Sequence, residues 1–549
     1  MIPPFASPVL PREHSDEERV RAYHEQTKHR PDRFAPAPET LDWDSQPAPF
    51  RRFDGAPAVL LPLGATPETF SPLSLASLGT FLRLSLAITA WKTQGPDRWA
   101  VRANPSSGNL HPVEAYLIVD GSADLESGVY HYRPEDHALE RRAHFRAPSP
   151  EGRTSPAALS IALTTIAWRE VWKYGERGFR YCQLDVGHAM AAVAYAAAAL
   201  GWRAREQPQL GSRTLARALG LDRANDFPTG RWADVEREEA EVLVAIELDA
   251  EAAVAVDPGK LEDAAANAQW CGTASRVDPR PMYEWPVIGD IMRATRSPRP
   301  SRRAAFPRGD PASLGSPSVD VILGRRSAQL FDHRHEMSSE DFFGLLDAFY
   351  TRRATPRDVL GNFFPVDLLL FVQRVATIPP GVYVTAGHSP TTPPCLASRL
   401  RHRLTEAPLR GYPSSVEVRL LARVDARPLA RLARGLHCNQ NIAAQACLAL
   451  GMVATFDAPI AEDPANYRRL HRQAGVLGHV LYLEAEKRGL RGTGIGCFFD
   501  DAVHDIAGLS NTEFQSLYHF TVGKAAGDRH LEPAPPYPER VASSVTPTR

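Results

Sequence analysis

The chain has 549 residues, too many for one ordinary hydrophobic core, so we expect two domains of roughly 250 residues each. Its 63 lysines and arginines are balanced by 64 aspartates and glutamates, so no global electric field attracts nucleic acid or an anionic membrane. This balance favours small or neutral partners and predicts neither a nucleic-acid nor a membrane partner.

The N-terminal segment and the cysteines give expectations about the compartment. Residues 1–20 lack the basic and apolar regions of a secretory signal, and the longest apolar run, near AMAAVAYAAAALGW, is too short to span a bilayer. The six cysteines never form a CxxC pair and lie in otherwise apolar segments, as is typical of reduced thiols. We expect a soluble, cytoplasmic protein.

The first half of the sequence mixes helical and extended patterns. Residues 77–92, SLGTFLRLSLAITAWK, have the apolar spacing of a helix. EAYLIVD at 114–120 and EVLVAIEL at 241–248 are apolar runs typical of strands. An alanine-rich helix is expected between Gly187 and Gly201. This mixture predicts an α+β fold.

The second half repeats the first. FFPVDLLLFV at 363–372 follows the similar LHPVEAYLIV at 110–119 by 253 residues, and the tripeptide GVY recurs at the same separation. Farther along, Gly475 and Gly489 repeat the earlier glycine pair at a separation of 288 residues. Repeated blocks at consistent separations indicate an internal duplication.

A segment rich in proline, arginine, glycine and serine separates the two copies. It includes RSPRPSRRAAFPRGDPASLGSPS at 296–318, a composition typical of a linker or of a segment that wraps over the surface. We therefore predict a first domain at 1–254, a linker at 255–315 and a second domain at 316–549. The proline-rich tail from residue 533 is expected to pack poorly.

The stretch RANPSSGNLHP at 102–112 is a candidate ligand loop. Proline fixes the chain direction, two hydroxyl groups and several backbone N–H groups follow, and glycine allows a flat or phosphorylated ligand to approach closely. The candidate cofactor-binding residues are Pro105, Ser106, Ser107, Gly108 and Asn109. On these residues alone, a plain turn before a strand is the alternative.

A complementary motif occurs in the second copy, where LGRRSAQLF occupies 323–331. Arg325, Arg326 and Ser327 would make a compact phosphate clamp, although such a cluster alone can be a solvated surface patch. The first copy has no Arg-x-Ser at the matching place, and the second has GNFFP at 361–365 instead of a Pro-Ser-Ser loop. The two motifs are therefore complementary across the copies.

Together these segments resemble a known family. RANPSSGNLHPVEAYLI, WKYGERGFRYCQLDVGH, GRRSAQLF and RGTGIGCFFDDAVHDIAGL are similar to motifs of the nitroreductase superfamily, specifically its SagB-type (azoline or thiazoline dehydrogenase) branch with a duplicated domain. The resemblance implies FMN bound at a dimer interface, with Arg-x-Ser from one subunit and Pro-Ser-Ser from the other. The two copies would then form an intrachain pseudo-dimer. Only one of its two interface sites has both motifs, which implies one FMN per chain.

The resemblance also completes the cofactor site. It adds Arg102, Gln329, Gly494, Ile495, Gly496 and Arg529. The glycine-containing loop at 494–496 would cover the flavin ring with backbone N–H groups, and Arg529 would reach the phosphate. Because Gln329 stands where many relatives have lysine or arginine, a neutral hydrogen bond would replace a charged contact.

Lys173 and Tyr174 match the Lys-Tyr pair implicated in catalysis in SagB-type dehydrogenases, and they belong to the copy that contains PSSG. A tyrosine beside a cationic amine can have a lowered pKa and act as a base, and the lysine can stabilise negative charge. Without the resemblance, an exposed lysine and a packing tyrosine are equally reasonable. His188 is expected to be a buried supporting group rather than a catalyst.

The implied function is an FMN-dependent oxidoreductase that oxidises a thiazoline or oxazoline ring, in a peptide or a related small molecule, by hydride transfer to FMN. An NAD(P)H-dependent nitro or quinone reductase would use the same flavin in the opposite direction. A catalytically silent flavin-binding scaffold is a third alternative. His437 and Cys438 have no second pair at ligand spacing, so no metal site is expected.

Overall fold

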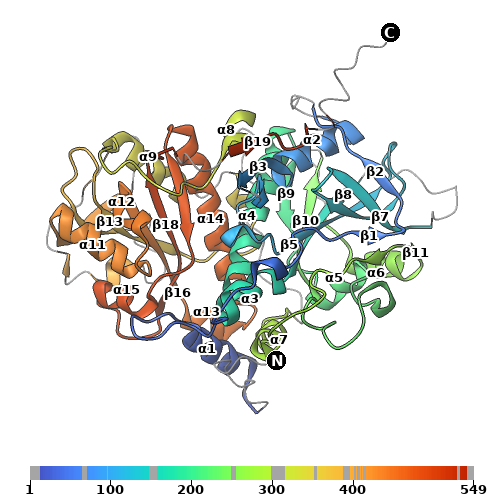
Figure 1. Ribbon diagram of the computed structural model, residues 1–549, viewed down its shortest axis with the longest axis horizontal. Helices are drawn as coiled ribbons and strands as arrows, with labels where there is room; N and C mark the ends of the chain where they lie inside the picture. Colours follow the sequence, from blue (N-terminus) through green and yellow to red (C-terminus); the bar gives the residue numbers. More distant parts are fainter. Residues whose placement is uncertain are drawn as a thin grey trace, which may run out of the picture.

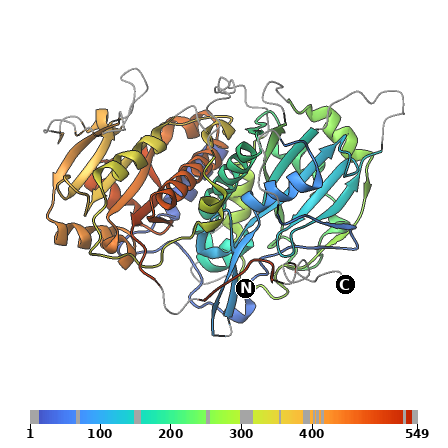
Figure 2. The same cartoon turned by 90° about the horizontal axis from the view of Figure 1, so that it is seen from above.

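Two antiparallel sheets flank a central pair of long helices in the computed structural model (Figures 1 and 2). The structure describes residues 13–64, 71–95, 97–146, 158–248, 255–297, 316–351, 355–386, 396–400, 403–404, 409, 411, 416–527, 532–538 and 540. We call residues 13–297 the first half and residues 316–540 the second half. Both contain sheets and helices, so the predicted α+β class is confirmed.

The first sheet lies in the first half. Its strands are β2 (Ala58–Leu60), β5 (Val113–Asp120), β6 (Gly128–Arg133), β7 (Ala138–His144), β8 (Ala158–Ile166), β9 (Arg203–Glu206), β10 (Glu238–Glu247) and β11 (Gln269–Trp270). They are arranged in the order β11-β7-β6-β5-β8-β10-β9, with β2 added on β7. Leu117 and Val119 of β5 face one hydrophobic core, and Tyr116 and Ile118 face another. Both faces are covered, which explains why β5 reads as a continuous apolar run.

The second sheet contains β13 (Val366–Val372), β14 (Gly381–Ala386), β15 (Glu417–Arg423), β16 (Leu448–Thr455), β17 (Arg491–Ile495) and β18 (Phe514–Gly523). Its order is β15-β14-β13-β16-β18-β17, which repeats the order β7-β6-β5-β8-β10-β9 of the first sheet. Strand β17 is an edge strand, although the sequence predicted a loop around Gly494. Pairing with β18 keeps this segment extended.

The central helices are α4 (Gly178–Ala199) and α14 (Asn466–Lys487). A Cβ atom on Gly187 would clash with the carbonyl oxygen of Arg472, and one on Gly475 would clash with that of Leu184. The absence of side chains therefore allows the two backbones to touch. Gly187 and Gly475 lie inside these helices rather than at their starts, contrary to the sequence-based expectation, because the crossing point requires them there.

Shorter helices cover the remaining faces. They are α1 (Asp16–Gln26), α2 (Leu75–Ser85), α3 (Trp168–Tyr174), α5 (Ser212–Ala218), α6 (Pro258–Ala266), α7 (Pro286–Ala294), α8 (Val319–Gly324), α9 (Ser339–Tyr350), α10 (Leu396–Arg399), α11 (Ala426–Leu436), α12 (Asn441–Gln445), α13 (Asp457–Glu462) and α15 (Asp500–Ala507). Helices α5 and α6 pack on the outer face of the first sheet, and α10, α11 and α15 on that of the second. Within the described residues, every helix is too short or too polar to serve as a bilayer span.

The helix predicted at 77–92 is wrong in its second part, which forms a strand. Helix α2 ends at Ser85, and β3 (Ile88–Gln94) then pairs with both β4 (Asp97–Arg102) and β19 (Glu532–Ala534). The β-branched and aromatic residues after Ser85 favour a strand, and the partners on both sides supply its hydrogen bonds.

Each end of the chain packs against the opposite half. Arg21 of α1 forms an ion pair with Asp457, and Lys28 Nζ lies 2.9 Å from Asp501 Oδ1. At the other end, Tyr537 is buried and donates a hydrogen bond to the Pro134 carbonyl at 2.9 Å. The expectation of a poorly packed tail is thus wrong for the described part of it, because this tyrosine fills a site in the first half.

The segment predicted as a linker, 255–315, is ordered structure where it is described. It contains α6, α7, β11 and β12 (Thr273–Ala274), and β12 pairs with β1 (Phe53–Asp54). Strand β11 extends the first sheet beyond β7. The described part of this segment therefore packs with the first half, and the domain boundaries remain a prediction.

Candidate functional site

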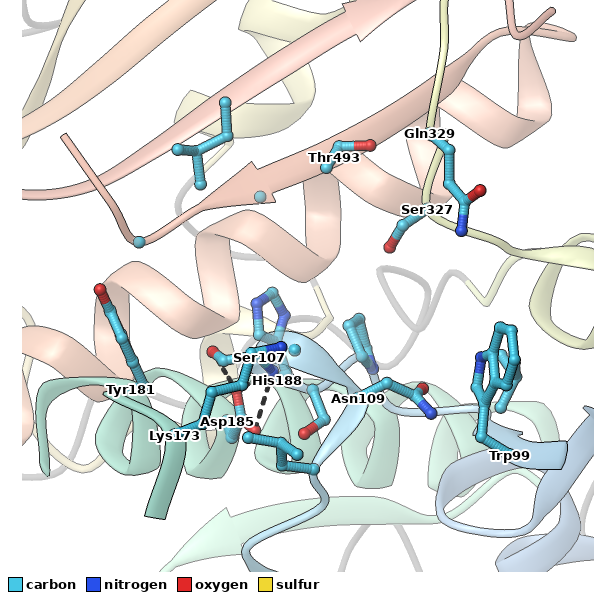
Figure 3. A pocket seen from close by; sticks show the side chains of 18 of the residues that line it. Trp99, Ser107, Asn109, Lys173, Tyr181, Asp185, His188, Ser327, Gln329 and Thr493 are labelled. Carbon is cyan, nitrogen blue, oxygen red and sulfur yellow. Dashed lines mark hydrogen bonds between the residues drawn. The ribbon is translucent and has the colours of Figure 1, made fainter. Parts of the chain in front are cut away.

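A cavity of about 970 Å³ lies between the two halves (Figure 3). In the close-up, Thr493, Ser327 and Gln329 form one wall and residues of α4 and the PSSG loop form the opposite wall. The cavity is lined by Arg102, Pro105, Ser106, Ser107, Gly108, Asn109, Lys173, Tyr174, Arg325, Arg326, Ser327, Gln329, Gly494, Ile495 and Gly496. Of the predicted site residues, only Arg529 is missing from this set, and it lies outside the described residues.

The PSSG loop begins where β4 ends and has an unusual backbone. Gly108, Asn109 and His111 all have positive φ angles of 54–59°. The shape is fixed by side chains, because Ser106 Oγ accepts a hydrogen bond from the His111 N–H at 2.8 Å and Asn109 Nδ2 donates to the Ala100 carbonyl at 2.5 Å. A Cβ atom on Gly108 would clash with the Tyr174 hydroxyl. Glycine at this position therefore allows Tyr174 to reach the loop.

Asp185 of α4 binds the PSSG loop through hydrogen bonds. Its carboxylate accepts hydrogen bonds from the Ser107 N–H at 3.0 and 3.1 Å and from Ser107 Oγ at 2.9 Å, as Figure 3 shows. Burial raises the pKa of Asp185 to about 7, and the hydrogen bonds from Ser106 and Ser107 only partly oppose this effect. Asp185 was not among the predicted site residues. The available signal was an acidic residue in an otherwise apolar helical segment.

Arg325 links the two halves at the cavity. Its Nε and Nη2 atoms donate to the carbonyl groups of Ala103 at 3.2 Å and Arg102 at 2.9 Å. Its side chain is buried, its guanidinium lies 5.2 Å from the Tyr482 ring centroid, and Nη1 has no hydrogen-bond partner among the described residues. Burial lowers the pKa of Arg325. One donor of this cation is therefore free to bind a ligand.

Arg326 is used differently from what the clamp hypothesis expects. Its Nη1 atom donates to Thr89 Oγ1 at 3.0 Å and to the Leu323 carbonyl at 2.8 Å. Burial and the neighbouring Arg325 charge lower its pKa to about 10. The structure thus gives Arg326 a bridging role to β3, and a phosphate contact by both arginines remains a prediction.

Ser327 belongs to a short hydrogen-bond chain. Its Oγ atom lies 3.0 Å from the Tyr482 hydroxyl, which also accepts a hydrogen bond from the Gly494 N–H at 2.8 Å. A Cβ atom on Gly494 would clash with the Tyr518 hydroxyl, and one on Gly496 would clash with the Tyr181 ring. The glycines therefore allow β17 to lie directly against aromatic residues of the cavity wall.

An arginine of the first half anchors the segment after β17. Arg177 Nη2 donates to the Gly496 carbonyl at 3.0 Å, and Arg177 Nη1 lies 2.9 Å from Asp500 Oδ2. Arg180 binds the other oxygen of Asp500 at 2.9 Å. Neither contact was predicted, because Gly496 lies more than 300 residues from Arg177 in the sequence.

Lys173 and Tyr174 occupy the end of α3 at the cavity wall. The Lys173 amine lies 5.1 Å from the Trp43 ring centroid and 5.2 Å from that of Tyr174. Burial lowers the pKa of Lys173, whereas burial and the nearby Glu170 raise the pKa of Tyr174 well above its ordinary value. The expected lowering of the tyrosine pKa is not found, because burial and the nearby carboxyl groups favour the neutral phenol. Burial thus opposes the charged form of both side chains.

His188 also faces the cavity. Its Nε2 atom lies 3.0 Å from the Tyr518 hydroxyl, and its Nδ1 atom has no hydrogen-bond partner within the described part of the chain. Burial and Arg325 lower the pKa of His188 to about 3, so the imidazole is neutral at physiological pH. A neutral ring is suited to packing or hydrogen bonding.

Comparison with known proteins finds a family match for a segment of the first half. Residues 98–230 match the model that describes the nitroreductase family. This segment is a nitroreductase-family domain. Members of that family are FMN-dependent oxidoreductases, so the domain belongs to an FMN-dependent enzyme family.

Two relatives each match about a quarter of the chain. A protein of Methanocaldococcus jannaschii named as a nitroreductase is 30% identical over 138 residues, which is 24% of this chain and 66% of the relative. The trifolitoxin-processing protein TfxB of Rhizobium leguminosarum bv. trifolii is 34% identical over 137 residues, which is 22% of this chain and 37% of that protein. The chain thus spans less than two thirds of either relative.

A solved structure shows the fold over a longer range. The crystal structure of a nitroreductase-like protein from Anabaena variabilis matches 93% of this chain and 100% of its own, with a TM-score of 0.67 and 21% identity. The nitroreductase fold therefore extends over both halves.

The residues of the cavity fit FMN. Its volume falls in the range of small-molecule sites, about 300–1,000 Å³. The unpartnered, buried Nη1 of Arg325 is a donor suited to an anionic phosphate. Glycines at 108, 494 and 496 leave room for the side chains of Tyr174, Tyr518 and Tyr181, so aromatic residues line the walls where a flat ring system could pack.

Proposed function

We propose that the chain is an FMN-dependent dehydrogenase of the SagB type, which binds one FMN in the cavity between its halves and oxidises an azoline-like ring of a peptide or small molecule. One observation carries this proposal. The PSSG loop and Lys173 of the first half face the Arg-x-Ser segment of the second half across a single cavity of about 970 Å³.

The crossing of α4 and α14 supports an intrachain pseudo-dimer. Gly187 meets Arg472 while Gly475 meets Leu184, and both pairs are related by the same 288-residue separation. Reciprocal contacts of this kind define an interface with twofold symmetry. The repeated strand order of the two sheets is consistent with the same relation. We therefore treat the halves as tandem nitroreductase-like domains.

The pseudo-twofold relation pairs the FMN cavity with a second position in the chain, and protein side chains occupy that position. There β9 takes the place of β17, and the cavity lined by Glu206, Pro208, Arg468 and Arg472 measures only about 40 Å³. Arg468 Nη1 lies 2.6 Å from Glu241 Oε2, and Arg472 pairs with the same carboxylate. The Gly361 N–H donates to Glu206 Oε2 at 2.7 Å. Because charged side chains occupy the volume that a flavin would need, we infer a single site.

The residues of the cavity have separable roles in this proposal. Arg325 Nη1 and Ser327 would hold the phosphate, and the backbone at 494–496 would lie against the ring system. Bound FMN supplies the hydride acceptor. Lys173, with its lowered pKa, would accept the proton from the azoline ring, and Tyr174 would donate a hydrogen bond to the developing anion. The similarity to a trifolitoxin-processing protein supports a natural-product substrate.

Purification tests the cofactor first. We expect a yellow protein that releases FMN on denaturation. Arg325→Ala should weaken FMN binding by at least about tenfold, the scale of a lost charge-assisted hydrogen bond. Arg427→Ala, which changes an exposed arginine on α11, is the matched control and should retain the flavin. Unchanged flavin content after dialysis of the Arg325 variant would contradict the assigned phosphate site.

Steady-state assays then separate the enzyme alternatives. A peptide containing a thiazoline or oxazoline should be oxidised to the azole with oxygen as the final acceptor. Turnover with NADPH and a nitro or quinone compound, without azoline oxidation, would favour the reductase alternative. A flavin-loaded protein inactive in both assays would favour the scaffold alternative.

A further inference from the structure

Two cysteines of the second half meet at the cavity wall. Cys438 follows α11 and Cys497 follows β17, and both thiols are partly exposed and line the cavity. The two loops are joined by Gln440 Nε2, which bonds to the carbonyls of both His437 and Cys497, and each thiol acts on the pKa of the other. The pair therefore combines proximity with access, the two conditions for forming a reversible disulfide.

A side-chain amide and a left-handed backbone turn hold the two cysteine-containing loops next to each other. Gln440 Nε2 donates to the carbonyl of His437 at 3.0 Å and to that of Cys497 at 3.1 Å, so one amide bridges the two loops. Cys438 and Asn439 have φ angles of +51° and +59°, a left-handed conformation that non-glycine residues rarely adopt. Strained backbone of this kind is concentrated at functional sites.

An arginine lies beside the pair. Arg177 Nη2 donates to the Gly496 carbonyl at 3.0 Å, next to Cys497, and its charge acts to lower the pKa of both thiols against the effect of burial. A cation at this position favours the thiolate that thiol–disulfide exchange requires.

The other described cysteines lack this combination. Cys182 and Cys447 are buried and have raised pKa values because of burial. Cys271 is partly exposed but does not line the cavity, and its thiol lies against the Arg141 carbonyl at 3.0 Å. Cys271 is thus a matched control, because it is a partly exposed cysteine that does not line the cavity beside another thiol.

We propose that Cys438 and Cys497 form a redox-active dithiol that reduces the flavin bound in the same cavity. The inference rests on the proposed FMN site. In this step two S–H bonds break and one S–S bond forms, and the two electrons and two protons convert oxidised FMN to its dihydro form. A thiol reductant in solution restores the pair by thiol–disulfide exchange and is itself oxidised to a disulfide. The protein would then catalyse electron transfer from small thiols to its flavin.

The thiol pair is tested independently of the flavin. The full chain is treated with diamide, its remaining thiols are alkylated, and its peptides are analysed by mass spectrometry. We expect a Cys438–Cys497 cross-link in the wild type and in Cys271→Ser, and its loss in Cys497→Ser. Cys438→Ala provides a second variant if a serine variant does not fold. A wild-type chain without this cross-link overturns the proposal.

The electron-transfer step is tested anaerobically with dithiothreitol as the thiol. We expect the flavin absorbance of the wild type and of Cys271→Ser to be bleached, and this bleaching to be lost in Cys438→Ser and Cys497→Ser that retain FMN. Bleaching at the wild-type rate in both variants would overturn the dithiol role. A chain without FMN would overturn the proposed function and the flavin step together, whereas the cross-link would still report on the pair.

Discussion

At the scale of single residues, burial determines how the polar groups of the cavity behave. Tyr174 and Lys173 are adjacent in sequence, yet desolvation moves their pKa values in opposite directions, each away from the charged form. His188 is kept neutral for the same reason. The same physical effect therefore acts on all three side chains, and in each it favours the neutral form.

Changing Lys173 or Tyr174 tests their assignment to catalysis. Lys173→Ala and Tyr174→Phe should lower kcat for azoline oxidation by about a hundredfold to ten-thousandfold, because each removes a proton-transfer or hydrogen-bonding group from the transition state. Bound FMN should stay at the wild-type level. Lys260→Ala on α6, an exposed lysine, is the control.

Other outcomes of this experiment have distinct meanings. Loss of FMN from either variant would indicate that Lys173 and Tyr174 hold the FMN site in shape rather than act in catalysis. Wild-type turnover of a confirmed azoline substrate would show that the pair is wrongly assigned. Near-normal NADPH oxidation in both variants would favour the reductase, because hydride transfer from a nicotinamide needs no base from the enzyme.

Asp185 should make stability depend on pH. Its pKa is about 7 in the folded chain, against the ordinary value of 3.8 for an aspartate, so between these values the folded state holds a proton that the unfolded state has released. The free energy of unfolding therefore falls as pH rises through this window, by at most about 4 kcal/mol, and stays low above it. Thermal unfolding of the flavin-free chain at several pH values should show this fall in the wild type and a weaker one in Asp185→Asn. Identical pH profiles would contradict the assignment, and Asp320→Asn at an exposed position is the control.

The sequence could predict the residues within motifs but not the partners that orient them. Ser107 and Arg325 were selected because hydroxyl and guanidinium groups in short glycine-flanked or helix-flanking segments suit phosphate binding. Asp185 and Tyr482 lie 78 and 155 residues from the groups they contact, and no local pattern records such pairings. The hydrogen bonds from Arg325 to the backbone carbonyls of Arg102 and Ala103 also depend on tertiary packing, so the sequence could not predict them.

At the scale of secondary structure, the two central helices position the site. Helix α4 supplies Asp185 and His188, and α14 supplies Tyr482, so the spacing of these helices sets the distance between the cavity walls. The apolar runs predicted the strands well because both faces of each sheet are covered. Gly494 and Ile495 were expected in a loop because glycines are common in loops, whereas pairing with β18 makes them the end of strand β17, and Gly496 follows that strand.

Gly187→Ala tests the helix crossing. A methyl group there must displace the Arg472 backbone, so we expect the free energy of unfolding to fall by about 1–3 kcal/mol, as for other overpacked sites. Gly435→Ala on α11 is the matched control, because a Cβ atom there meets nothing within 4 Å. Helix propensity alone would make that control more stable by about 0.5–1 kcal/mol. Denaturant unfolding compares the two, and equal effects would argue against a tight crossing.

At the scale of the whole molecule, the two halves share a fold but differ in what they retain. The first half keeps the PSSG loop and the second half keeps the Arg-x-Ser segment, so one cavity receives both. At the related position the arginines of α14 are paired with Glu239 and Glu241 instead. Such asymmetry explains why a duplicated chain would need only one flavin.

Flavin stoichiometry tests this asymmetry. We expect one FMN per chain, measured from the flavin released on denaturation against protein concentration. The double variant Phe363→Ser, Phe364→Ser should bind no additional FMN, because the matching Arg-x-Ser is absent and charged side chains fill the space. Two FMN per wild-type chain, or a rise in the double variant, would show that the second site is intact or repairable.

The exchange of chain ends between the halves has a consequence for biosynthesis. Strand β3 of the first half is completed by β19, and the Ile88 N–H donates to the Tyr537 hydroxyl, 449 residues later in the chain. Nascent chains emerge N-terminus first, so the first half leaves the ribosome with one edge of β3 unpaired. That edge can be closed only after residues 532–534 of β19 have been synthesised. Contacts so distant in sequence slow folding, and an exposed strand edge promotes aggregation, so β3 is vulnerable for as long as the second half is being made.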